Sequence, residues 1–170
     1  MPPKPNPQKP TQGGEAKRLL VAVDSAVTFA PDGKRFAFVR ETGEAGESAI
    51  VLANADGSGE QILCTQKTPD YFAVEGPSWS DDGKLIAVAM GRATPKFHFQ
   101  IVTIKVKTGE IIPLSEQQWD WAAKVAWLPS MRGLVVIGRH EQERMPNDQL
   151  WLVDYPSGQS QQLLPGLNTY

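Results

Sequence analysis

One pattern occurs three times along this chain, and its nearly constant spacing restricts the fold more than any other feature. Each copy begins with a short apolar segment that ends in an aromatic residue, passes through a turn, and continues into a longer apolar run. The copies span residues 27–39, 77–89 and 125–137. Their aromatic anchors are Phe29, Trp79 and Trp127, which lie 50 and 48 residues apart. A repeat of this length indicates a series of equal structural units.

Each unit continues with the same two further elements. A second apolar run follows the first, and a last short run completes the unit after a glycine-containing turn. The second runs are 49–53, 100–104 and 149–153; the turns are 56–59, 107–109 and 156–158; the last runs are 61–63, 111–114 and 161–164. The β-branched and aromatic residues of these runs favour strands, and Gly and Asp favour the turns between them. The pattern predicts four short strands in each unit and shows no sustained helical period.

A single four-stranded sheet cannot bury both of its faces. Sheets of this kind bury themselves by packing face to face around an axis, which is the architecture of a β-propeller. We therefore predict an all-β fold, a β-propeller fragment of three four-stranded antiparallel blades. The predicted blades are 26–64, 76–114 and 124–164. A β-sandwich is the alternative fold, although it would not need three matching units.

The start of the chain differs from the repeats in two ways. Residues 11–20 match the turn and the last strand of a unit, so we expect one extra N-terminal outer strand at 16–20, and a partial propeller over 13–170. The first ten residues contain five prolines, which predicts an extended linker over 1–12. Propellers usually close with four to eight blades, so three blades leave two open sides. The expected partners are the remaining blades of a parent propeller, another protein, or a second copy that closes a six-blade ring.

Composition excludes several kinds of partner. The formal net charge is −2 and 41% of the residues are hydrophobic, which is typical of a globular domain and gives no electrostatic reason to expect nucleic acid. No apolar run reaches the roughly 20 residues of a membrane-spanning helix, so we expect no membrane insertion. No signal peptide is apparent, which predicts a cytoplasmic chain as written. Cys64 is the only cysteine, so an internal disulfide and a cysteine metal cluster are excluded.

The repeats resemble a known family. The segments 29–38 and 79–88, together with the turn at 53–60, resemble the TolB-like, WD-repeat-like β-propeller proteins. A narrower likeness, at 24–29, 125–129 and 150–158, is to the C-terminal propeller of bacterial serine/threonine protein kinases. That resemblance implies an extracytoplasmic sensor or interaction domain behind a membrane helix, in contrast to the compartment expected from the chain itself. The third repeat departs from the family pattern, with Ser130 to Gly133 where Asp-Gly is usual, which puts its turn in doubt.

The sequence contains no recognisable catalytic motif. Kinase motifs, a phosphate-binding P-loop and the Gly-x-Ser-x-Gly nucleophile elbow are all missing from it. His140 with Glu141 and Glu143 could provide metal ligands, but an ordinary hairpin loop at 139–148 explains them better. The alternate oxygen-bearing residues at 54–60 are explained as a hairpin turn and not as a calcium loop. We therefore predict no enzyme activity, no cofactor and no metal site.

The sequence predicts a set of structural turn residues and a set of candidate binding residues. Structural turns are predicted where Asp caps the turn and Gly takes a left-handed conformation, at Asp32, Gly33, Asp56, Gly57, Asp82 and Gly83. Candidate binding residues lie in the connections between units, where propellers often carry binding loops, at Tyr71, Phe72, Trp119, Asp120 and Trp121. Packing between blades is the alternative role for these aromatic residues.

The function expected from these observations is a non-catalytic propeller module for protein–protein interaction or ligand sensing, within a larger multidomain protein. The alternative is the accessory propeller domain of a larger enzyme of the prolyl-oligopeptidase type, which would gate the access of substrate.

Overall fold

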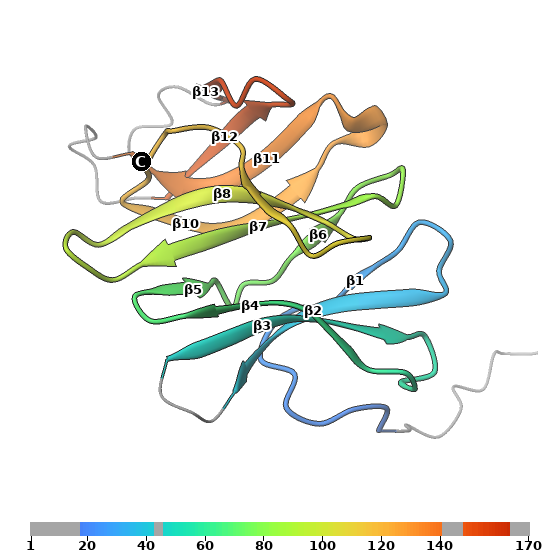
Figure 1. Cartoon of the computed structure of the whole chain (residues 1–170). Helices are drawn as coiled ribbons and strands as arrows, with labels where there is room; N and C mark the ends of the chain where they lie inside the picture. Colours follow the sequence, from blue (N-terminus) through green and yellow to red (C-terminus); the bar gives the residue numbers. More distant parts are fainter. Residues whose placement is uncertain (1–17, 43–45, 141–147, 164–170) are drawn as a thin grey trace, which may run out of the picture.

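The computed structural model describes residues 18–42, 46–140 and 148–163. Over these residues the chain folds into three antiparallel sheets, stacked like neighbouring blades of a propeller (Figure 1). The described residues contain one 3-10 turn, η1 (Pro129–Met131), and no α-helix. None of their segments is therefore a helix of the length and apolarity needed to cross a bilayer. The predicted all-β propeller fragment with three four-stranded blades is confirmed.

Each blade is an antiparallel sheet whose strands follow one another in chain order. Blade one contains β1 (Thr28–Phe29), β2 (Arg35–Thr42), β3 (Glu47–Asn54) and β4 (Gln61–Lys67). Blade two contains β5 (Asp70–Phe72), β6 (Ser78–Trp79), β7 (Leu85–Arg92), β8 (His98–Lys105) and β9 (Ile111–Pro113). Blade three contains β10 (Trp121–Trp127), β11 (Gly133–Arg139), β12 (Gln149–Asp154) and β13 (Ser160–Gln162).

The connections between blades contribute more strand than the repeat indicates. β5 and β6 both pair with β7, so the inner strand of blade two is split in two. β10 begins at Trp121, before the predicted start of its blade at 124, and a bulge between Ala122 and Val125 interrupts its pairing with β11. These stretches have irregular apolar spacing, which is why a period of two residues does not identify them.

Alternation along the strands gives each blade two apolar faces. We call the side towards the next blade in the sequence the following face, and the opposite side the preceding face. In β2, Ala37 and Val39 lie on the following face and pack against Ile86 and Val88 of blade two. The same arrangement recurs one blade later, where Ala87 of blade two packs in one cluster with residues of blade three. The core of the molecule is therefore made of two blade-to-blade interfaces, with side chains that alternate between them.

The preceding face of blade one has no neighbouring blade among the described residues, yet most of its apolar side chains are buried; Phe29, at 55% exposed, is the exception. Phe36, Phe38 and Val51 are at most 5% exposed, and Leu20 packs against their cluster. Leu20 belongs to residues 18–26, which run across blade one and are called the strap below (Figure 1). The strap is thus part of what covers this face.

Only residues 18–20 of the extra outer strand predicted at 16–20 are described, because residues 16 and 17 lie outside the described ranges. Residues 18–20 are not assigned to a strand. Their position is nevertheless that of an outer strand. A side chain on the turn residue Gly57 would clash with the carbonyl oxygen of Leu19, just as one on Gly109 would clash with Leu63, which belongs to β4.

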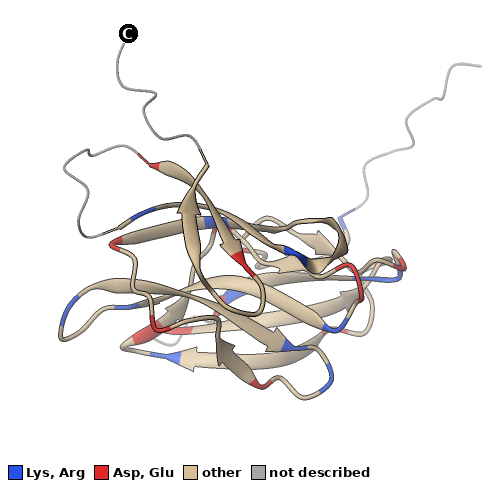
Figure 2. Ribbon diagram, turned by 90° about the horizontal axis from the view of Figure 1, so that it is seen from above, with Lys and Arg blue, Asp and Glu red and all other residues tan. Residues whose placement is uncertain are grey.

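The two ends of the blades differ in what they carry. One end holds the turns between the first and second strands and between the third and fourth strands, and we call it the turn end. The other end holds the hairpins between the second and third strands and the connections between blades, and we call it the hairpin end. In Figure 2 most of the Lys, Arg, Asp and Glu residues lie in these turns, hairpins and connections. Residues far apart in the sequence meet at each end.

Candidate functional site

The candidate binding residue Phe72 does not lie on the surface. Its side chain is 1% exposed and packs in the interface between blades one and two. Its backbone N–H donates a hydrogen bond to Ser48 Oγ over 2.9 Å. β5 adds this segment to the sheet of blade two, so Phe72 is a core residue. The prediction that Phe72 contacts a binding partner is therefore wrong.

Trp119 is likewise a core residue, with 2% of its surface exposed. It exchanges backbone hydrogen bonds with Phe99 of β8, which draws the connection into the interface between blades two and three. Its ring stacks on His140 with centroids 3.8 Å apart and meets the edge of Trp151 at 5.6 Å. The prediction that Trp119 is an exposed binding residue is therefore wrong. Its side chain packs between blades, which was the alternative role for these aromatic residues.

His140 lies in this aromatic cluster. Burial lowers the pKa of its imidazole, and Gln117 Nε2 lies 2.8 Å from one of its ring nitrogens. Gln117 in turn accepts a hydrogen bond from Ser160 Oγ at 2.9 Å. Over the described ranges no three His, Cys, Asp or Glu side chains are grouped so that they could hold a metal ion; Glu141 and Glu143 lie outside those ranges.

The other three candidates lie nearer to solvent. Asp120 is exposed, and Tyr71 and Trp121 are half-buried. Both rings pack edge-on against Phe99, with centroid separations of 5.9 Å for Tyr71 and 5.2 Å for Trp121. Burial and the nearby Glu75 raise the pKa of the Tyr71 hydroxyl. Tyr71 and Trp121 form a partly accessible aromatic group at the hairpin end, and the exposed Asp120 precedes Trp121 in the chain.

The predicted turn residues in the first two repeats form matching turns. Asp32 Oδ1 accepts a hydrogen bond from the backbone of Lys34, and Asp82 Oδ1 accepts the equivalent one from Lys84, each at 3.0 Å. Gly33 and Gly83 follow these Asp residues with φ of 67° and 73°. In the turn between β3 and β4, Asp56 Oδ1 accepts from Ser58 N at 2.9 Å, and Gly57 has φ of 86°.

The third repeat has left-handed backbone at the same position, but with a methionine in place of the glycine. Met131 occupies the position of Gly33 and Gly83 and has φ of 54°, next to Ser130 with φ of 64°. Left-handed backbone costs a residue with a Cβ roughly 1–2 kcal/mol. The doubtful turn at 130–133 therefore forms, but under strain.

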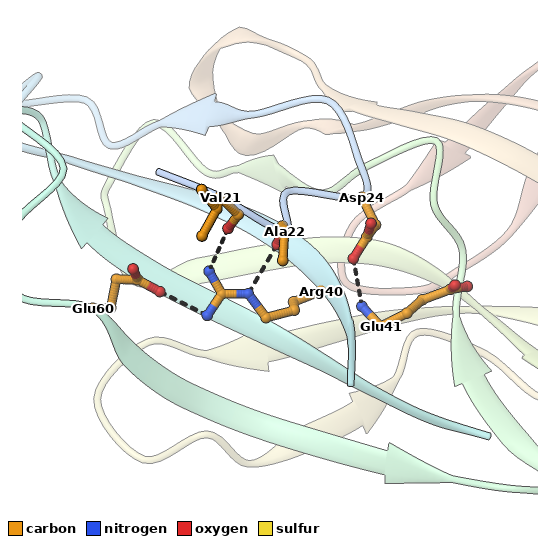
Figure 3. A network of polar contacts seen from close by, with 6 residues as sticks. All are labelled: Val21, Ala22, Asp24, Arg40, Glu41 and Glu60. Atoms are coloured by element: carbon orange, nitrogen blue, oxygen red, sulfur yellow. Dashed lines mark hydrogen bonds and ion pairs between the residues drawn. The ribbon is translucent and has the colours of Figure 1, made fainter. Parts of the chain in front are cut away.

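Several hydrogen bonds attach the strap to blade one, among them those of Arg40 and Asp24 (Figure 3); Val39 N also donates to Ser25 Oγ at 2.8 Å. Arg40 donates from its guanidinium to the carbonyl oxygens of Ala22 at 2.9 Å and Val21 at 3.1 Å. The same group pairs with Glu60 at 2.6 Å. Asp24 Oδ2 accepts from the backbone N–H of Glu41 at 2.9 Å. Nothing in the sequence pattern marks this network, because its partners are backbone groups.

A row of hydroxyls connects the inner strands of successive blades. Trp79 N donates to Thr28 Oγ1 at 3.1 Å, and Trp127 N donates to Ser78 Oγ at 3.0 Å. The equivalent position in blade three is Ala126, which has no hydroxyl. The series of connections thus ends at blade three.

The following face of blade three is apolar and open. Val135 and Ile137 of β11, with Leu150 and Leu152 of β12, occupy the positions that are filled in blade one by Ala37, Val39, Ile50 and Leu52. The four residues of blade one are at most 3% exposed, whereas Ile137 and Leu150 are 38% and 36% exposed. This face is the largest difference between the ends of the blade stack.

Cys64 is an ordinary buried thiol in this arrangement. It packs against the interface between blades one and two, and burial raises its pKa to about 11. A thiol with so high a pKa is protonated near neutral pH and is a poor nucleophile.

The comparisons with known proteins find the fold and not a close relative. The chain matches no protein-family model. A search of the curated proteins finds no relative. Among solved structures, TolB from Acinetobacter baumannii is 19% identical with a TM-score of 0.62, and covers 81% of this chain and 31% of its own length. A putative TolB from Agrobacterium tumefaciens is 21% identical with a TM-score of 0.61, covering 81% of this chain and 45% of its own.

A protease propeller is similar to the same degree. The β-propeller domain of the Trilobed protease from Pyrococcus furiosus is 18% identical with a TM-score of 0.59, over 83% of this chain and 42% of its own length. The chain therefore spans less than half the length of these structures. At such identities the likeness shows the fold alone, which is that of β-propeller blades. The comparisons give no support to the narrower likeness to kinase-associated propellers, which stays a prediction.

Proposed function

We propose that this chain is a non-catalytic propeller module that binds a further four-stranded blade through the following face of blade three. The observation that carries the proposal is the open apolar row of Val135, Ile137, Leu150 and Leu152. Exposed apolar patches of this kind often mark surfaces that bind another protein. The absence of catalytic motifs in the sequence supports a binding role over a catalytic one.

Continuity with the two existing interfaces supports a particular occupant for this face. The same positions in blade one are covered by Ile86 and Val88, which lie on the preceding face of the next blade. A sheet with aliphatic side chains at every second position of a strand, as at Ile86 and Val88, would cover the open row in the same way. We therefore propose a blade of the same repeat type as the partner, provided by the rest of a propeller or by a second protein.

A second copy of this chain is a weaker candidate for the occupant. In a six-blade ring of two copies, the following face of blade three would meet the preceding face of the other copy's blade one. That face is already packed against Leu20. The strap and β13 of the other copy would also contend for one position as outer strand, so the strap would have to leave first.

The test is the solution mass of the chain, measured by light scattering over a concentration series up to about 1 mM. An uncovered apolar face should make the average mass rise above the 18.6 kDa of one chain. The double variant Ile137→Glu/Leu150→Glu should keep the mass of one chain throughout. A matched double variant, Val27→Glu/Ile62→Glu, alters exposed aliphatic residues elsewhere and should associate like the wild type. Equal behaviour of all three proteins would contradict the proposal.

A second candidate function is supported by the similarity to the Trilobed protease propeller and to a putative dipeptidyl aminopeptidase IV from Bacteroides ovatus. In this case the chain would be the accessory propeller domain of a larger hydrolase and would gate its substrate. Sequencing the coding region on both sides of this segment distinguishes the candidates. A hydrolase domain with a Gly-x-Ser-x-Gly elbow would favour the accessory role.

A further inference from the structure

A cavity of about 820 Å³ opens at the turn end, where turns of all three blades meet. Its walls come from the start of β2, from two turns of blade two and from two turns of blade three. The residues that matter for its chemistry are Arg35, Lys84, Lys105, Lys107, Met131 and Tyr155. The volume is within the range of roughly 300–1,000 Å³ that small-molecule sites usually have.

Positive charge dominates this cavity. Four of its lining residues are cationic, and Asp82 is the one acidic residue among those that line it. Lys84 Nζ lies 3.4 Å from Asp82 Oδ2, and Lys105 Nζ lies 2.8 Å from Glu110 Oε2. Arg35 and Lys107 form no ion pair with any residue of the described chain. Two positive charges are therefore left without a carboxylate, in a protein whose net charge is −2.

The charges converge because of how blade two differs from its neighbours. Lys105 and Lys107 lie in the turn between β8 and β9. The equivalent turn of blade one contains Asn54 and Asp56, and that of blade three contains Asp154 and Pro156. Exposed Asp and Asn keep a turn soluble as well as lysine does. Solubility therefore does not explain why the lysines are concentrated in the turns of blade two.

The remaining wall is apolar and contains the strained turn of blade three. Met131 lies in the cavity wall at the position where the other repeats have glycine, in left-handed backbone. Tyr155 beside it packs edge-on against Trp127 with centroids 5.1 Å apart. On the opposite side the guanidinium of Arg35 lies 5.5 Å from the centroid of the Trp79 ring. Strained backbone that persists in a fold is often found at ligand sites.

We infer that this cavity binds an organic anion, with a phosphate or carboxylate group held by Lys84, Lys107 and Arg35 and an apolar part against Met131 and Tyr155. Arginine and lysine donate charge-assisted hydrogen bonds to such oxygens, and the aromatic and thioether side chains pack against the carbon body of the ligand. The inference does not depend on the interaction proposed at blade three, which lies on a different surface.

The test uses 1-naphthyl phosphate as the anionic probe and 1-naphthol as its neutral counterpart, with binding measured by isothermal titration calorimetry on the whole chain. We expect the phosphate to bind and its affinity to fall as salt is raised, because the contacts are electrostatic. Naphthol should bind at least about tenfold more weakly, since it lacks the group that the cations hold.

Two variants locate the site. Lys84→Gln/Lys107→Gln removes two of its cations and should weaken phosphate binding at least about tenfold. Lys34→Gln/Lys67→Gln removes the same charge from exposed lysines outside the cavity, and Lys34 has the repeat position of Lys84. This control should bind within about twofold of the wild type. Equal affinity in both double variants, or no binding of the phosphate by the wild type, would overturn the inference; thermal unfolding of each variant verifies that it is folded.

Discussion

At the scale of single residues, the third repeat shows how far a sequence pattern can change while the fold is kept. Gly33 and Gly83 adopt left-handed backbone at no steric cost, and Met131 adopts it with a Cβ. The sequence puts this turn in doubt because Asp-Gly is missing there, but it does not reveal that a turn still forms, with left-handed backbone at Met131 and a contact with blade two. Ser130 N donates to Asp81 Oδ2 at 2.8 Å, so blade two helps to hold the unusual turn.

The strain at Met131 is measurable by substitution. Met131→Gly removes the Cβ from a left-handed position and should raise the free energy of unfolding by about 1 kcal/mol, measured by urea denaturation. Met131→Ala retains the Cβ and serves as the control, so it should not gain stability. A glycine variant no more stable than the alanine variant would show that the turn is not strained.

Residue type alone also misassigned two of the candidate binding residues. Phe72 and Trp119 lie in connections, where aromatic residues suggest an exposed interface. Each is drawn inward by backbone pairing that the repeat does not encode, Phe72 with Met90 in β7 and Trp119 with Phe99 in β8. The alternative of packing between blades, which the sequence left open, accounts for both.

At the scale of elements, the strands and their order were predictable because apolar runs and glycine turns recur at one period. The strap was only half predictable. Its resemblance to an outer strand is visible in the sequence, but its attachment depends on Arg40 bonding to the backbone oxygens of Val21 and Ala22, which no side-chain pattern marks. The turn-end cavity was missed for a different reason, since its three lysines lie in two separate turns of blade two and Arg35 comes from blade one.

Arg40 can be tested as the attachment of the strap. Arg40→Met keeps much of the aliphatic stem and removes the guanidinium, so the contacts with Val21, Ala22 and Glu60 are lost. We expect faster amide hydrogen exchange in residues 19–25 and a loss of about 1–3 kcal/mol in the free energy of unfolding. Arg132→Met, at an exposed arginine of blade three, is the control. Unchanged exchange in the strap of the Arg40 variant would show that other contacts hold it.

At the scale of the whole molecule, the three blades form a short one-dimensional stack. Within the part of the chain that the structure describes, blade two is covered on both faces, blade one is covered by blade two and packed against the strap, and blade three is covered by blade two alone. In such stacks the stability of a unit depends mainly on its contacts with its neighbours.

This arrangement predicts a gradient of local stability. Amide hydrogen exchange under native conditions should be fastest in β12 and β13 of blade three and slowest in β7 and β8 of blade two, because only blade two has two complete interfaces. Addition of a partner that covers blade three should slow the exchange of β12 and β13 alone. Uniform protection across the three blades would instead indicate that the stack opens as one unit.

The strap gives the stack a direction. A chain with two complementary open ends can add to copies of itself head to tail without limit, and such non-closing contacts produce fibres. Here one end is occupied by the chain's own residues, anchored through Arg40 and Asp24. Head-to-tail growth by copies of this chain would therefore require the strap to be released, so we expect the segment that packs against the cluster of Phe36 and Phe38 to oppose polymerisation as well.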